Sequence, residues 1–218
     1  MTTMQLNPNA LPNIIILRRR SQALAMLDAI VCPEWESRYY SFNASWGEEE
    51  AMGSMRNGSG DDWCILFGTF GAAIKGLAHE TSMAGDKAFA DEVQVHVPQT
   101  FSSFLTEPAF KMDWLSYCYW RRPEDPNWHK VLHPDPMLSQ SEDGSAEYLA
   151  LLYEPASSYK EFAEWYYELN LPITAIESIY QHAPLTESLV RSLNSEVSIT
   201  QAQEAAEEIG YPSGQSNA

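Results

Sequence analysis

Residues 63–79 read WCILFGTFGAAIKGLAH and carry the clearest structural signal in the chain. Two apolar runs flank a Gly-Thr-Phe-Gly turn, and this arrangement predicts a β-hairpin. If Phe67 pairs with Ala72, alternate side chains of the two strands point to the same face. We expect this face to pack on the core, because it carries Trp63, Ile65, Phe67, Ile74 and Ala78.

Further strands are predicted on both sides of the hairpin. Residues 40–46 alternate between large apolar and polar side chains, which is typical of a half-buried strand. The segment 56–62, RNGSGDD, has turn chemistry. Residues 93–97 form a short extended run of alternating valines, and residues 114–120 and 147–153 are the remaining strand candidates.

Helical spacing dominates the last third of the chain. Earlier in the sequence it predicts helices over 21–31, where Pro33 ends the helix, and over 100–105. From residue 157 the strand pattern is replaced by helix-start signals, which are Ser158 with Glu161, Thr174 with Glu177, and Thr200 with Gln203. Strands gathered early and helices gathered late predict an α+β fold with a mostly antiparallel sheet and a C-terminal helical segment.

A single domain accounts for most of the length. The polar, proline-containing stretch 1–12 is expected to be a flexible arm, and 213–218 a flexible tail. Residues 13–212 are then expected to form one α+β domain, whose helical part covers 157–212. A chain of 218 residues is long enough to bury a sizeable core in one domain.

The net charge is strongly negative. The chain has 13 Lys and Arg against 30 Asp and Glu, a formal charge of −17. Its hydrophobic fraction of 44% is too high for a disordered acidic protein, so the acidic residues are expected on a folded surface. Such a surface repels nucleic acids and anionic membranes and favours basic protein partners.

The cysteines and the apolar runs indicate a cytoplasmic protein. Cys32, Cys64 and Cys118 are odd in number and widely spaced, which is typical of free thiols in a reducing compartment. The longest apolar runs fall short of the roughly 20 residues of a membrane span and lack the order of a secretory signal.

Cysteine and histidine residues offer two sets of candidates for chemistry. Cys64 and His79 share one face of the hairpin, but the expected register puts Lys75 opposite Cys64. A nucleophilic cysteine needs a base within hydrogen-bond reach, so the pair makes a poor catalytic dyad.

His129 and His133 are four residues apart, with Cys118 upstream. The prolines around them oppose a helix, and no further ligand completes a zinc set. The sequence therefore favours a non-catalytic protein with no metal and no cofactor.

The residues expected to contact a partner are acidic, with one aromatic exception. Steering by carboxylates and locking by a few aromatic anchors is the mechanism that the composition favours. The tryptophan is singled out because it stands in a proline-rich loop, where it would be exposed. The expected set is Glu48, Glu49, Glu50, Asp61, Asp62 and Trp128.

Three stretches resemble segments of an uncharacterised bacterial protein family, and the resemblance spans most of 22–212. They are MGSMRNGSGDD at 52–62, ILFGTFGAAIKGLAHE at 65–80 and FAEWYYELNLPI at 162–173. This resemblance implies no catalytic residue. In general character the chain is also similar to the immunity proteins of bacterial toxin systems, which are small, acidic, cytosolic α+β proteins that bind and block a toxin.

The leading hypothesis is thus an acidic cytoplasmic protein that binds a basic partner, of which a toxin is one example. Two alternatives stay open. One is a small-molecule enzyme that uses the Cys64 and His79 pair or the His129 and His133 pair. The other is a structural subunit of a larger assembly. The sequence leaves the oligomeric state undetermined.

Overall fold

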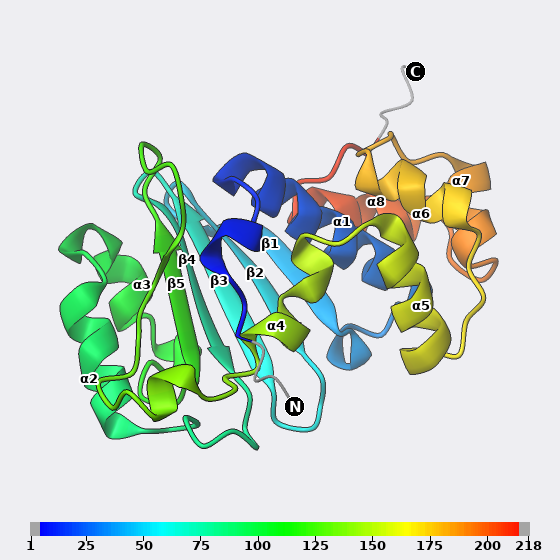
Figure 1. The fold of residues 1–218 in the computed structure, drawn as a ribbon. Coiled ribbons are helices and arrows are strands. Elements are labelled where there is room, and N and C mark those ends of the chain that lie inside the picture. The colour runs from blue at the N-terminus through cyan, green and yellow to red at the C-terminus, as the bar shows by residue number, and fades with distance from the viewer. Residues whose placement is uncertain (1–4, 214–218) are drawn as a thin grey trace.

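A six-stranded antiparallel sheet forms the centre of the protein, as Figure 1 shows. The structure is a computed structural model that describes residues 5–213. The strands lie side by side in chain order, so each is connected to its neighbour. They are β1 (Tyr40–Gly47), β2 (Glu50–Arg56), β3 (Asp62–Gly68), β4 (Gly71–Leu77), β5 (Tyr117–Arg121) and β6 (His129–Lys130).

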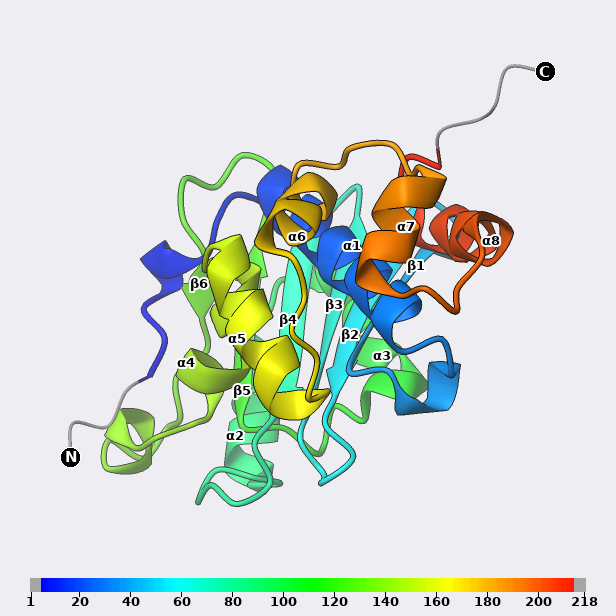
Figure 2. The same ribbon diagram turned by 90° about the vertical axis from the view of Figure 1, so that its right-hand side faces the viewer.

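Helices cover both faces of this sheet, and the fold is α+β as predicted. One face, seen in Figure 2, is covered by α1 (Ile14–Val31), α5 (Ala156–Tyr166), α6 (Ile173–Tyr180), α7 (Glu187–Leu193) and α8 (Ile199–Ile209). The opposite face is covered by α2 (Lys87–His96) and α3 (Ser102–Thr106). A short α4 (Ser145–Tyr148) precedes α5.

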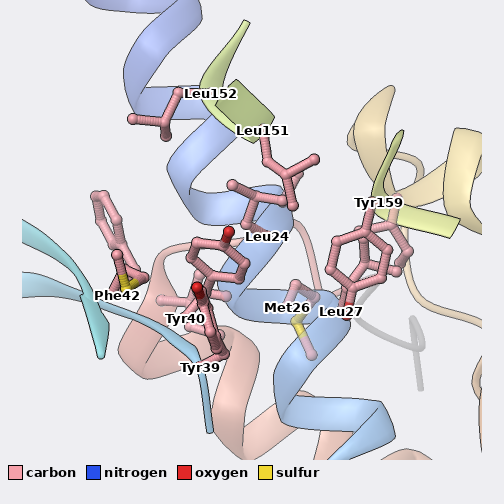
Figure 3. Close-up of a cluster of buried hydrophobic side chains, with 14 of the residues drawn as sticks. Leu24, Met26, Leu27, Tyr39, Tyr40, Phe42, Leu151, Leu152 and Tyr159 are labelled. Atoms are coloured by element: carbon pink, nitrogen blue, oxygen red, sulfur yellow. The ribbon is translucent and has the colours of Figure 1, made fainter. Parts of the chain in front are cut away.

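The sheet separates two hydrophobic cores. The larger core lies under α1, where Leu24 and Leu27 face Tyr40 and Phe42 of β1 and Tyr159 of α5 (Figure 3). The smaller core lies under α2 and α3 and includes Leu66, Phe89, Phe101, Phe104 and Cys118. Both faces of the central strands are therefore buried, and this explains why β3 and β4 are almost continuously apolar.

The hairpin of β3 and β4 has the predicted register. Phe67 pairs with Ala72, and Cys64 pairs with Lys75. The face that carries Trp63 packs into the larger core as expected. Its opposite face is buried as well, because α2 and α3 cover Leu66. The turn predicted over 56–62 is also present, between β2 and β3.

Two segments predicted as extended are helical. Residues 93–97 belong largely to α2, where Phe89 and Val93 lie one turn apart on the buried face while Val95 is exposed. Asp86 caps this helix by accepting a hydrogen bond from the backbone N–H of Phe89. Residues 147–153 form the end of α4 and a 3-10 turn. The run at 147–153 has no clear period, and such a short apolar run does not distinguish strand from helix.

Several element boundaries differ from the sequence pattern. Helix α1 begins seven residues before residue 21, because Asn13 caps it at Ile16. Strand β2 was not predicted, since its buried residues are small or flexible: Ala51, Gly53 and Met55. The expected caps at Ser158, Thr174 and Thr200 are also wrong, and the cap positions are Pro155, Pro172 and Ser198.

The N-terminal segment is anchored to the body of the protein. Leu6 and Leu11 are each 5% exposed. The Tyr119 hydroxyl donates to the Leu6 carbonyl at 3.0 Å, and the Trp128 indole N–H donates to the Pro12 carbonyl at 2.7 Å. Residues 5–12 thus pack against the sheet where a flexible arm was expected. The first four residues of that arm, and 214–218 of the expected tail, lie outside the described residues.

Candidate functional site

The two predicted acidic clusters lie at opposite ends of the sheet. Glu48 and Glu49 form the turn between β1 and β2, whereas Asp61 and Asp62 follow the turn between β2 and β3. The length of β2 separates the turns, about 20 Å for a seven-residue strand. The clusters therefore do not form one contiguous binding surface. Glu50 begins β2 opposite Gly47.

Asp61 is largely neutralised by its own surroundings. It is 5% exposed, and its Oδ1 lies 2.7 Å from Nδ1 of His79. The Tyr148 hydroxyl donates to its Oδ2 at 2.8 Å, and the Asn57 amide donates to the same oxygen. Burial raises the pKa of Asp61, but the hydrogen bonds from His79, Tyr148 and Asn57 outweigh it and leave the pKa below its usual value. The hydrogen bond between the His79 ring and Asp61 raises the pKa of His79.

Asp62 pairs with a buried lysine. Lys75 is 2% exposed, and its ammonium lies 2.5 Å from Oδ1 of Asp62. In the sheet Lys75 is flanked by Cys64 of β3 and Cys118 of β5. A buried ammonium needs an anionic partner, so Asp62 offsets the charge of Lys75. This role leaves Asp62 less available to a partner protein than the sequence suggested.

Trp128 is buried, in contrast to the expected exposed anchor. Its side chain is 4% exposed and belongs to the larger core. The N-terminal segment covers it and supplies the Pro12 carbonyl that accepts its indole N–H. A tryptophan whose ring and N–H are both satisfied inside the protein cannot serve as an exposed interface residue.

A hollow of about 410 Å³ opens beside Asp61 and gathers acidic residues that the sequence did not single out. Glu80, Glu142 and Glu147 are exposed and line it together with Asp61 and Tyr148. No Lys or Arg is among the described residues that line it. His79 stands beside it, with its Nε2 3.9 Å from a carboxylate oxygen of Glu80. The arrangement concentrates negative potential in a concave site.

A tight contact at the end of β4 builds this hollow. The Ser116 hydroxyl accepts the N–H of Ala78 and donates to the carbonyl of Asp143, both at 2.8 Å. Gly144 follows with φ of +82°, and a Cβ there would lie 2.2 Å from the Cβ of Ala78. Only glycine allows this approach. It brings the start of α4, and with it Glu142 and Glu147, next to the segment after β4.

The hollow was missed because its acidic residues come from three separate segments. Asp61 precedes β3, Glu80 follows β4, and the other two glutamates flank or belong to α4. The nearest sequence signal is Gly144, because a glycine just before a helical pattern indicates a special backbone conformation. Their proximity depends on the tertiary contact and has no counterpart in residue spacing.

Cys64 and His79 do not meet. Cys64 pairs with Lys75, and His79 lies four residues further along the chain, beyond the end of β4. Burial raises the pKa of Cys64 to about 12, which opposes formation of the nucleophilic thiolate. The Nδ1 atom of His79 is already engaged by Asp61.

His129 and His133 point into different surroundings. His129 is half exposed, stacks on Trp120 and lies 3.3 Å from a carboxylate oxygen of Asp125. His133 is buried, and its Nε2 lies 3.2 Å from Asp86. Within residues 5–213, no group of three or more His, Cys, Asp or Glu side chains is arranged to hold a metal ion.

None of the helices described for residues 5–213 has the length and apolar character required to cross a membrane.

Comparison of the chain with protein-family descriptions, with curated proteins and with solved structures finds no match. The functional argument therefore depends on the geometry of the hollow and on the charge of the protein.

Proposed function

We propose that this protein is a non-catalytic binding protein that holds a basic side chain of a protein partner in the acidic hollow beside Asp61. The observation that carries the proposal is the set of three exposed glutamates, Glu80, Glu142 and Glu147, around a concave site lined by no lysine or arginine of the described chain. Such a site attracts cations and holds them by charge-assisted hydrogen bonds.

Arginine is the side chain that suits this hollow best. The carboxylates line the hollow from three segments of the chain. A guanidinium offers five N–H donors in a fixed plane, so it can donate to several of them at once. The volume of about 410 Å³ is within the range of ligand sites and leaves room for the side chain with part of its backbone. Tyr148 adds an aromatic surface on which a guanidinium can stack.

The rest of the surface supports the same kind of partner. The net charge of −17 raises the rate of encounter with a basic protein and lowers it for nucleic acids. An inhibitor of a basic toxin is one protein of this type. In that case the hollow would receive an arginine of the toxin, and binding would block the toxin's own site.

A labelled tetra-arginine peptide tests the proposal by fluorescence anisotropy. We expect Glu142→Gln/Glu147→Gln to weaken its binding by about tenfold, since two partly exposed ion pairs contribute about 1 kcal/mol together or slightly more. The affinity for the wild-type protein should fall at high ionic strength.

The matched control is Glu204→Gln/Glu207→Gln on α8, which lies far from α4 in Figure 2. It removes the same two charges from exposed positions. A peptide attracted only by net charge would lose the same affinity in both variants, and that result would reject the hollow as the binding site.

A further inference from the structure

A second groove lies at the opposite end of the sheet from the acidic hollow. It runs between the first turn of α1 and the turn that joins β3 to β4, and consists of two adjoining hollows of about 440 and 210 Å³. Both hollows are lined by Ile14, Ile15, Gly68 and Gly71, so the groove is continuous. Ile15 is 73% exposed, and the neighbouring Ile16 is 48% exposed.

Arginines stand at both ends of this apolar floor. Arg18 and Arg19 line the larger hollow, and Arg121 lines the smaller one. The larger hollow also contains Glu49, one of the acidic residues singled out in the sequence. Among residues 5–213, none of these three arginines forms an ion pair, although the protein has a large excess of carboxylates.

The start of α1 offers its two arginines no acidic partner. Arg18 and Arg19 lie in its second turn, near the positive end of the helix dipole, and the first turn holds no acidic residue. Arg19 and Arg121 each donate one hydrogen bond inside the protein, to the carbonyls of Gln181 and Asp125. No such contact is described within residues 5–213 for the guanidinium of Arg18, and all three groups keep further N–H donors for an anion.

We propose that this groove binds an extended acidic segment of a partner protein in which an apolar side chain has an acidic residue on either side. The apolar side chain packs on Ile14 and Ile15. One flanking carboxylate pairs with Arg18 and Arg19, and the other pairs with Arg121. Charge complementarity selects this occupant, because an apolar groove alone would accept any hydrophobic segment.

The charge of the whole protein argues for a short peptide segment over other anions. A nucleic acid or an anionic membrane would extend past the groove onto a surface with a net charge of −17 and be repelled there. A second copy of this chain would have to place acidic residues of its own surface in the groove. Because the groove and the acidic hollow are at opposite ends of the sheet, that contact would be head-to-tail and would produce rings or open chains of molecules.

An array of octapeptides tests the groove. In one set Leu or Phe is flanked on both sides by Asp or Glu, in a second set Lys replaces the acidic residues, and in a third Ser replaces the apolar residue. We expect the labelled protein to bind the first set selectively. The peptide of this set that binds the wild-type protein most tightly should bind Ile15→Ser/Arg18→Gln about tenfold more weakly, which corresponds to about 1.4 kcal/mol.

The matched control is Val95→Ser/Lys87→Gln on α2, which also removes one exposed apolar and one exposed basic side chain. This variant should bind the peptide as the wild-type protein does. Equal binding by the three peptide sets, or equal losses in the two variants, would overturn the proposal. So would single-stranded RNA or anionic vesicles that bind the groove more tightly than the peptide. Concentration-dependent self-association that Ile15→Ser/Arg18→Gln abolishes would instead identify a second copy as the occupant and reject the acidic partner.

Discussion

Asp143→Ala is expected to lower the free energy of unfolding by about 3–5 kcal/mol, because it leaves the buried ammonium of Lys130 without its anion. Asp143 is fully buried, and its Oδ2 lies 2.6 Å from Nζ of Lys130. Its other oxygen accepts hydrogen bonds from the backbone N–H and the hydroxyl of Ser145, at 3.0 and 2.6 Å. Burial lowers the pKa of Lys130 despite the attraction to Asp143.

Urea denaturation and thermal melting measure this effect. For a chain of about 200 residues, each kcal/mol corresponds to about 2–4 °C, so Tm should fall by about 10 °C. The neighbouring Glu142→Ala removes an exposed carboxylate that has no ion pair among the described residues, and its effect should stay within about 0.5 kcal/mol.

A double variant distinguishes the loss of the ion pair from other damage at this position. In Lys130→Met/Asp143→Leu neither charge remains, so much of the stability should return. If Asp143→Ala and Glu142→Ala have the same Tm, the ion pair of Lys130 and Asp143 does not stabilise this part of the fold.

Lys130 also fixes the N-terminal segment, since its ammonium donates to the side-chain oxygen of Gln5 at 2.7 Å. Leu6 adds a backbone hydrogen bond to the Ser145 hydroxyl. The polar composition of 1–12 predicts a flexible arm, and the network that holds 5–12 in place comes from residues more than 100 positions away. Local composition therefore could not reveal it.

The hairpin was predictable because its signal is local. Glycines at 68 and 71 define the turn, and the alternation of Trp63, Ile65 and Phe67 fixes the register. The valines at 93–97 led to a wrong strand prediction, because their structure is decided by a tertiary contact and not by the local pattern. Their alternation matches a strand, but Asp86, Phe89 and Val93 have the spacing of a capped helix, and the second core selects the helix.

The candidate sites were less predictable than the fold. Adjacent acidic residues attract attention in a sequence, yet Asp61 and Asp62 already pair with His79 and Lys75 of the same chain. The glutamates of the acidic hollow come from separate stretches of the sequence, and the close contact of Gly144 with Ala78 brings these stretches together. A functional surface assembled by tertiary contacts leaves no pattern in residue spacing.

The second large effect is expected at Asp28, a fully buried residue of α1 in the larger core. Its carboxylate accepts the N–H of Tyr40 and the hydroxyl of Tyr159 at 2.7 Å, and the hydroxyl of Tyr167 at 2.8 Å. Figure 3 shows Tyr40 and Tyr159 beside this helix. Burial raises the pKa of Asp28 to about 6, although the three hydrogen bonds act in the opposite direction.

The raised pKa makes Asp28 a source of pH-dependent instability. Between about pH 4 and pH 6 the unfolded chain loses the Asp28 proton while the folded protein keeps it, so the folded state binds more protons. The free energy of unfolding therefore falls as pH rises through this window. The loss is complete above the folded pKa and is on the order of 3 kcal/mol, at about 1.4 kcal/mol for each pH unit between the two pKa values.

Asp28→Asn removes this titration and keeps a hydrogen-bonding group of the same shape. The amide oxygen can accept from Tyr40 and Tyr167, and the Tyr159 hydroxyl can rotate to accept from the amide nitrogen. We expect the variant to match the wild-type protein near pH 4 and to exceed its unfolding free energy by on the order of 3 kcal/mol at pH 8. Asp113→Asn, at an exposed position, should follow the wild-type curve. Urea titrations from pH 4 to pH 8 measure the difference, and parallel curves for wild type and Asp28→Asn would show that Asp28 does not limit stability at neutral pH.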